Sequence, residues 1–304
     1  NNPEVIKLNN MKEIPRFQEL CEKYDIIPTY LLSYECANRD EAISILKPIH
    51  DRQKCEIGHH LHVWSTPPFQ QENKGKDIDL AWIQAYQFEL PDSLFEEKAE
   101  TLKEKIKENY GIYPTSHRAG RFGIDQRSID WLIKHNFEVD TSIVPLNSFS
   151  LHKGKNKGGP DFYNVPVTPY LWKNSLNDSS LNELPISVYY PTNFFKKDFF
   201  NYGFGKKIGN QFGNRRLLSL NPAFEVNFNE KIIKSEIKKK RSILNLFLHS
   251  SELAIHCSPF TNTDKDYKNV WLILEKTFKF IKINGIKSLP ITQASRHLFA
   301  TRNL

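Results

Sequence analysis

The sequence lacks any long apolar run. None of its hydrophobic stretches approaches the ~18 residues that a helix needs to cross a bilayer, and no secretory signal peptide opens the chain. These absences predict a protein that is not transmembrane. The chain starts with Asn1-Asn2-Pro3, a poor natural start, so we expect the sequence to begin after the true N-terminus.

Cysteine is also scarce, with four residues in 304 and no CxxC pair of the kind that binds metals. We expect these four thiols to be small packed hydrophobes, and the lack of a disulfide framework favours a cytoplasmic, reducing compartment. No GxSxG elbow, Walker loop or Rossmann glycine fingerprint is present. Serine hydrolases, nucleotide hydrolases and dinucleotide enzymes therefore lose support.

Basic residues exceed acidic ones, 42 to 35, which gives a formal net charge of +7. The excess lies in residues 153–157, 196–207 and 238–241. Such runs usually form solvated faces; the alternative is attraction to anionic glycan, nucleotide sugar, nucleic acid or phospholipid, with membrane association through basic patches. The aromatic residues do not interleave with these runs in an RNA-binding pattern, so no specific nucleic acid is expected.

Strand-like and helix-like segments alternate along most of the chain, which predicts parallel strands with helices outside them. This pattern indicates one α/β domain over residues 1–304, as a doubly wound sheet or a (β/α) barrel. Residues 151–223 break the alternation and read as a long, aromatic-rich insertion over one face. We expect strands at 26–32, 55–62, 115–119, 137–143, 184–190, 243–248 and 286–289, and helices at 9–24, 40–46, 92–111, 125–135, 230–240 and 264–283.

Three histidines stand close together in Glu56-Ile57-Gly58-His59-His60-Leu61-His62. Residues two apart on a strand point to the same face, so His60 and His62 project together while His59 points away. A lone histidine is more often structural. Two imidazoles on one face at the carboxyl end of a strand favour a divalent metal site with room for a third ligand and a water.

Two further segments are expected at neighbouring strand ends. Arg118 and Arg121 lie among small residues in 116–123 and suggest a clamp for an anion or carboxylate, although a plain strand–helix loop explains them equally well. Residues 244–248 form an apolar strand that would deliver His249 to the rim of the sheet. A histidine beside a metal there is suited to protonating a leaving amine.

Taken together and in this order, these motifs resemble the polysaccharide deacetylases, also called carbohydrate esterase family four or NodB-homology proteins. The resemblance covers nearly the whole chain, and its nearest branch is the WalW-like deacetylases linked to lipopolysaccharide biosynthesis. The segments that carry it are 27–31, Glu56-Ile57-Gly58 with His60, 118–123, Val139-Asp140-Thr141-Ser142, Trp64-Ser65-Thr66-Pro67-Pro68 and His249-Ser250-Ser251-Glu252-Leu253.

The resemblance implies a distorted (β/α) barrel of about seven strands and a metal, usually zinc, held by His60 and His62. The implied activity removes N-acetyl groups from sugars that are nucleotide-linked, lipid-linked or polymeric, with His249 as the general acid and Arg118 orienting the catalytic carboxylate. Substrate contacts are implied for five residues: Trp64, Phe69, Arg121, Phe122 and Asp140.

The sequence departs from the family at two points. Position 64, four residues after His60, is Trp64, where most members have the second histidine, so His62 has to substitute. The family's acidic motif on the first strand has no counterpart here, since residues 1–8 contain only Glu4; we expect it to precede Asn1. Without it, the alternative is a catalytically inactive deacetylase fold that binds carbohydrate.

Overall fold

The computed structural model describes residues 6–71, 75, 77–189, 216–217 and 225–300. Its helices and strands follow one another in the order η1 (Asn9–Glu13), α1 (Ile14–Lys23), β1 (Thr29–Leu32), α2 (Tyr34–Asn38), α3 (Asp40–Asp51), β2 (Glu56–Leu61), η3 (Leu80–Trp82), η4 (Gln87–Glu89), α4 (Asp92–Tyr110), β3 (Ser116–Ala119), η5 (Gly120–Phe122), α5 (Gln126–Lys134), β4 (Val139–Asp140), β5 (Tyr170–Lys173), β6 (Ser180–Glu183), β7 (Val188–Tyr189), β8 (Arg216–Leu217), α7 (Phe228–Lys238), η7 (Ser250–Leu253), α8 (Asp264–Ile283) and α9 (Ile291–Ala300).

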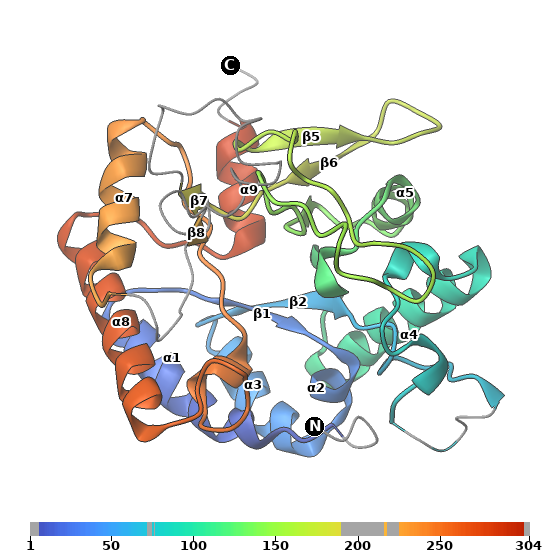
Figure 1. Cartoon of the computed structure of the whole chain (residues 1–304), viewed down its shortest axis with the longest axis horizontal. Helices are drawn as coiled ribbons and strands as arrows, with labels where there is room; N and C mark the ends of the chain where they lie inside the picture. The colour runs from blue at the N-terminus through green and yellow to red at the C-terminus, as the bar shows by residue number, and fades with distance from the viewer. Residues whose placement is uncertain (1–5, 72–74, 76, 190–215, 218–224, 301–304) are drawn as a thin grey trace.

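The centre of the fold is a six-stranded sheet with the order β1-β2-β3-β4-β6-β5. Every neighbouring pair is parallel except β5 and β6, which form an antiparallel hairpin. Helices surround this sheet: α4 and α5 lie on one side of the molecule, and α7 and α8 lie on the other (Figure 1). The predicted α/β class is confirmed.

Local sequence signals explain where several helices begin and end. Asp125 caps α5 by accepting a hydrogen bond from the N–H of Ser128, and Thr263 with Asp266 forms a capping box at α8. Gly111 ends α4 at a φ of +81°, a left-handed conformation that glycine adopts without strain. Gly58 has a different role: a Cβ there would collide with Ser116 and Leu31, so glycine allows β1, β2 and β3 to pack closely.

β1 is an edge strand of the described sheet, paired only with β2. The chain between α8 and α9 runs beside the strand: the N–H of Ile27 bonds to Ser288 Oγ, and the N–H of Ile291 bonds to Thr29 Oγ1. These side-chain bonds replace the backbone ladder of a further strand.

Three predicted strands were wrong in detail. Residues 243–248 and 286–289 belong to no strand, and the strand predicted at 184–190 appears instead as β6 and β7 on either side of Pro185. Asn245 is held mainly by its side chain, whose Nδ2 donates to Thr141 Oγ1 and to the carbonyl of Leu184. Apolar periodicity could not show that side-chain contacts would hold this segment in place of a strand ladder.

The insertion at 151–223 is described only in part. Its described portion includes the β5–β6 hairpin, while 190–215 and 218–224, and with them the basic run 196–207, lie outside the described residues. In the part of the chain that the structure describes, no helix is both long and apolar enough to span a membrane.

Candidate metal and catalytic site

The carboxyl end of β2 carries the histidine pair. In the register of the sheet, His59 lies opposite His117 and His60 lies opposite Arg118 on β3. His59 has no exposed surface, whereas His60 is half-buried and His62, just beyond the strand, has 24% of its side chain exposed. The predicted alternation is confirmed: neighbouring His59 and His60 face opposite sides of the sheet.

The nitrogens of His60 and His62 point at each other. Their Nε2 atoms are 2.9 Å apart, and their ring planes are inclined by 66°. His60 Nδ1 lies 2.8 Å from the carbonyl oxygen of Arg118. Because a carbonyl only accepts, His60 donates through Nδ1 and presents a lone pair at Nε2.

His62 is oriented in a similar way. Its Nδ1 lies 3.7 Å from Oε1 of the buried Glu35, and Trp64 stacks on its ring at 4.5 Å. With the proton of His62 on Nδ1, two Nε2 lone pairs would face each other at 2.9 Å. A bound cation would stabilise that arrangement, whereas with the proton on Nε2 His62 would donate a hydrogen bond to His60.

The spacing suits a metal ion. Two nitrogens bound to zinc at ~2.0–2.1 Å in tetrahedral geometry stand ~3.3 Å apart, close to the observed 2.9 Å. Partial burial and the charge of His62 hold the pKa of His60 well below its usual range, which favours the neutral, ligating form. In the described part of the chain, no third His, Cys, Asp or Glu joins these two in a metal-binding group.

Gly120 permits the arginine segment to approach this pair. A Cβ at Gly120 would collide with the carbonyl oxygen of Leu61 and press on His62. The backbone of β3 and η5 therefore lies directly against the end of β2. This close approach is what brings the Arg118 carbonyl within reach of His60.

The guanidinium of Arg118 lies in a buried polar cluster. Its Nε and Nη2 donate to the carbonyl and hydroxyl oxygens of Thr141 at 3.0 and 3.1 Å. Burial lowers the pKa of Arg118 to about 10, although the negative charges of Asp140 and Glu183 act to raise it. Burial and the charge of Asp140 raise the pKa of Glu183 well above its usual range.

Asp140 was predicted to contact substrate, and the structure does not fit that role. Its side chain has no exposed surface, and its carboxyl oxygens accept from the N–H and hydroxyl of Ser142 at 2.7 and 2.8 Å. Asp140 is enclosed because it lies on the short central strand β4, between β3 and β6. Glu183, its neighbour on β6, carried no motif and was missed by the sequence reasoning.

His249 lies at the surface, with 61% of its side chain exposed. Its Nδ1 is 3.3 Å from Oε1 of Glu252, a carboxylate whose side chain is only 8% exposed. The charge of His249 contributes to lowering the pKa of His60, which puts the two imidazoles within electrostatic reach. A histidine with one nitrogen on a carboxylate and the other free has the arrangement of a general acid or base.

Phe247 links His249 to the arginine segment. Its ring lies 5.8 Å from the ring of His249, 5.4 Å from the Arg118 guanidinium and 6.0 Å from the ring of Phe122. Phe122 also stacks on Phe149 at 5.6 Å. The structure thus brings Arg118, Phe122 and His249 together around one aromatic side chain.

Arg121 points away from this group. It donates to the carbonyl oxygens of Gln84 and Lys153, and its guanidinium lies 4.2 Å above the ring of Tyr86. These contacts tie η5 to the loop at residues 153–158. The clamp expected from Arg118 and Arg121 together does not form, because the two side chains contact different groups.

Lys98 of α4 anchors the loop that follows His62. Lys98 is fully buried and donates to the carbonyl oxygens of Thr66 and Pro68 at 2.6 and 2.9 Å, with Asp79 at 3.4 Å. Phe69 lies 5.5 Å from its ammonium group. Phe69 therefore takes part in anchoring this loop; its predicted substrate contact remains a prediction.

The insertion reaches the arginine segment through a chain of aromatic contacts. Phe162, a buried residue of the insertion, contacts Phe149 at 6.3 Å, and Phe149 in turn stacks on Phe122. Cover of the site mouth by this segment remains a prediction, since much of the insertion lies outside the described residues.

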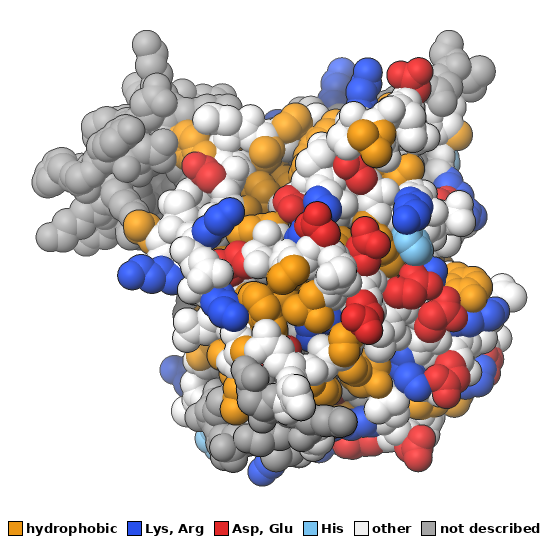
Figure 2. Space-filling view, turned by 90° about the vertical axis from the view of Figure 1, so that its right-hand side faces the viewer, with side chains coloured by type: hydrophobic (Ala, Val, Ile, Leu, Met, Phe, Trp, Pro, Cys, Tyr) orange, Lys and Arg blue, Asp and Glu red, His pale blue; other side chains and the backbone are white. Residues whose placement is uncertain are grey.

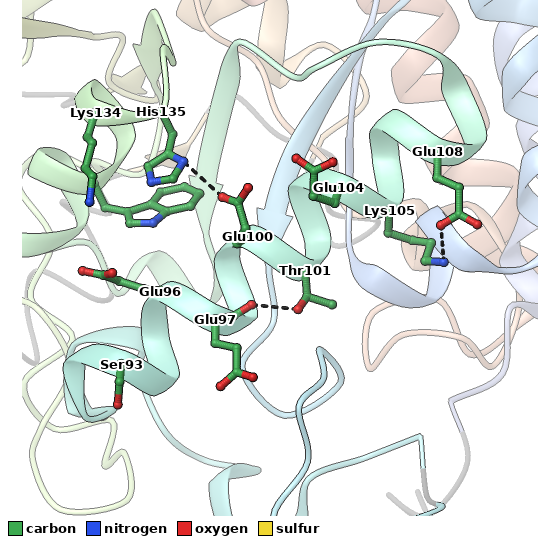
Figure 3. Close-up of a pocket in the computed structure, with 11 residues that line it drawn as sticks. Ser93, Glu96, Glu97, Glu100, Thr101, Glu104, Lys105, Glu108, Lys134 and His135 are labelled. Carbon is green, nitrogen blue, oxygen red and sulfur yellow. Dashed lines mark hydrogen bonds and ion pairs between the residues drawn. The ribbon is translucent and has the colours of Figure 1, made fainter.

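A separate hollow of about 710 Å³ lies between α4 and α5. Figure 2 views this side of the molecule and shows acidic and apolar side chains gathered on it. In Figure 3 the carboxylates of α4 line the hollow, and Glu100 pairs with His135, 3.1 Å away. None of the predicted site residues lines it, so the chemistry of the histidine pair is not located there.

Solved structures share this fold. A Mycobacterium smegmatis protein assigned as a polysaccharide deacetylase superposes with a TM-score of 0.54 at 13% identity, over 97% of this chain and 78% of that one. A 4-alpha-glucanotransferase from Thermococcus litoralis gives a TM-score of 0.54 at 12% identity, over 92% of this chain but only 35% of the transferase. No protein-family model matches the sequence, and a search of curated proteins finds no match. The similarity thus extends to the fold, an α/β architecture on which both of these proteins are built.

Proposed function

We propose that the protein is a metal-dependent N-deacetylase of carbohydrates, with His60 and His62 as metal ligands. The observation that carries this proposal is the pair of Nε2 atoms facing each other at 2.9 Å at the end of β2, with His249 within electrostatic reach. Metal-assisted amide hydrolysis uses imidazole nitrogens that bind the metal and a separate histidine, held by a carboxylate, that transfers a proton.

A divalent metal at this pair, with zinc the first candidate, would polarise the acetamide carbonyl and activate a water molecule. His249, whose Nδ1 lies beside Glu252, would deliver a proton from Nε2 to the departing sugar amine, and the proton that the water loses would restore it. Arg118 would hold the backbone carbonyl that orients His60, because its side chain is fixed to Thr141.

The carbohydrate substrate is supported by two observations. Trp64 is partly exposed where it stacks on His62, so an aromatic face borders the metal ligands, as sugar-binding sites commonly require. The fold also recurs in a protein assigned as a polysaccharide deacetylase and in a glucanotransferase. We extend the proposal to sugars of surface polysaccharide or lipopolysaccharide biosynthesis, on the motif resemblance to the WalW-like branch.

The test is release of acetate from N-acetylated sugars. Purified protein would be incubated with nucleotide-linked N-acetylhexosamine and with N-acetylglucosamine oligosaccharides, with zinc and with a chelator in excess. We expect zinc-dependent acetate release from one substrate class, abolished in His60→Ala. If neither class yields acetate from metal-loaded protein, the proposal fails for those substrates.

A second candidate is a carbohydrate-binding protein without catalytic activity. It is favoured by the finding that the described residues supply only two clustered metal ligands. It predicts saturable binding of the same sugars, by calorimetry, with no acetate released.

A further inference from the structure

Glu35 is a buried acidic residue that lies beside the histidine pair. It belongs to the first turn of α2, directly after β1, and only 9% of its surface is exposed. No pattern in the sequence predicts that a glutamate in this five-residue helix is buried. Burying a carboxylate is costly unless a cation or several hydrogen bonds compensate for the lost water.

His62 provides a partner, because its imidazole is within ion-pair range of the Glu35 carboxylate. Among the described residues, no lysine or arginine pairs with Glu35, and its Oε2 has no hydrogen-bond partner. The buried carboxyl group is therefore directed at one imidazole.

The side of the imidazole that Glu35 faces defines what it can do. Oε1 lies 3.7 Å from His62 Nδ1, whereas His60 faces the opposite nitrogen, Nε2. A cation held between the two Nε2 atoms would thus lie across the His62 ring from Glu35. In the same way, the Arg118 carbonyl lies across the His60 ring.

We propose that Glu35 is a positioning residue of the metal centre, which holds the proton of His62 on Nδ1 and so commits Nε2 to the metal. This inference rests on the proposed metal site at His60 and His62. Metal-bound histidines commonly donate their other N–H to a carboxylate or carbonyl, which fixes the tautomer and makes the ligand more basic. In this chain the backbone carbonyl of Arg118 would take this role for His60, and the carboxylate of Glu35 would take it for His62.

The test compares metal affinity in four proteins: wild type, Glu35→Gln, Glu35→Asp and the control Glu41→Gln, an exposed glutamate on the neighbouring α3. Zinc affinity would be measured by competition with a chromophoric chelator, and coordination by the visible absorption of bound Co²⁺. We expect Glu35→Gln to weaken zinc binding about 10–100-fold with an unchanged Co²⁺ spectrum. Glu35→Asp should recover part of the loss, and Glu41→Gln should match wild type.

Each other result overturns a stated part of the proposal. Equal zinc affinity in wild type and Glu35→Gln would show that Glu35 does not act on the centre. A changed Co²⁺ spectrum would make Glu35 a direct ligand. Wild-type protein that binds no metal would defeat the proposed metal site itself, and this inference with it.

A measurement on wild-type protein removes any dependence on how well the variants fold. In zinc-loaded protein with ¹⁵N-labelled histidine, the nitrogen shifts of His62 report which ring atom carries the metal. We expect a protonated Nδ1 and a metal-bound Nε2. A metal-bound Nδ1 would contradict the assigned role of Glu35.

Discussion

Two histidine pairs occupy opposite faces of the same strands. On one face, His59 Nδ1 lies 2.8 Å from His117 Nδ1, and His59 Nε2 lies 3.2 Å from the carbonyl oxygen of Ala99. The rings of Trp131 and Phe137 enclose this pair, which is almost fully buried. On the other face, His60 and His62 meet at the edge of the sheet with their Nε2 atoms opposed.

The comparison shows that residue type does not decide function here. His59 and His60 are adjacent in sequence, and in both pairs two ring nitrogens face each other while a third bonds to a backbone carbonyl. The pairs differ in access: the inner pair is enclosed in the core, whereas the outer pair is partly exposed at the edge of the sheet, where a cation can reach it. Four predictions test this division; the three on metal binding and catalysis are ordered by the size of the effect expected, and the fourth concerns stability.

The largest effect should separate His60 from His59. His60→Ala removes one of two nitrogen ligands and should weaken zinc binding by more than about a hundredfold. Even the loss of a residue that only hydrogen-bonds a metal ligand lowers metal affinity about 10–100-fold. His59→Ala should retain zinc affinity but lose about 2–4 kcal/mol of unfolding free energy, because it opens a cavity and leaves His117 unpaired. Chelator competition and urea unfolding measure the two quantities. Equal zinc losses in both variants would erase the distinction between the pairs.

The second effect concerns His249, whose charge contributes to the electrostatics of His60. Its replacement by alanine should lower kcat for acetate release by roughly a hundredfold or more, the usual contribution of a general acid. Zinc content, measured by atomic emission, should not change. Loss of the metal together with the activity would make His249 a ligand and not an acid.

A smaller effect is expected at Glu252, which the sequence reasoning did not single out as a site residue. Glu252→Gln keeps the shape of the side chain but removes the charge beside His249 Nδ1, so kcat should fall on the order of tenfold, less than for His249→Ala. Glu97→Gln, an exposed glutamate on α4, is the matched control. A rate equal to that of the control would show that His249 needs no carboxylate.

The fourth effect is a pH dependence of stability that comes from the inner pair. Burial lowers the pKa of His59 to about 3 and holds the pKa of His117 well below its usual range. The unfolded chain, with histidine pKa values of about 6.5, binds more protons below that pH, so stability should fall as the pH drops from about 6.5 toward 3. Each histidine contributes at most about 1.4 kcal/mol per pH unit.

The double variant His59→Phe with His117→Phe isolates this term. It removes both titrating groups, so its unfolding free energy should depend less steeply on pH across the same range, as measured by urea unfolding at several pH values. An unchanged slope would assign the acid sensitivity to other groups.

Many of the helices and strands were predictable because they depend on local periodicity. The 3.6-residue and two-residue patterns located α1, α3, α4, α5, α7 and α8 and the strands β1 to β3, since side chains of one element must share a buried face. The short α2 and the helix α9 were not anticipated. β4 is only two residues long, where seven were expected, because its neighbours pair with it over Val139 and Asp140 only.

Site residues divide along the same line. His60, His62 and Arg118 were identified correctly as neighbours at strand ends, because parallel strands bring their carboxyl ends to one edge. Arg121 was grouped with Arg118 from spacing, but its backbone at a φ of +51° turns the side chain toward Tyr86. No spacing rule reports such a turn.

The sequence by itself determined which side chains of β2 share a face, since alternation follows from the covalent geometry of an extended chain. It also determined the α/β class through the order of its periodic segments. Only the tertiary structure decided that Glu35 meets His62, that Glu183 lies opposite Asp140, and that residues 243–248 dock through Asn245. These contacts join elements that are distant in the chain, and their energies depend on burial, which arises when the sheet and its helices pack together.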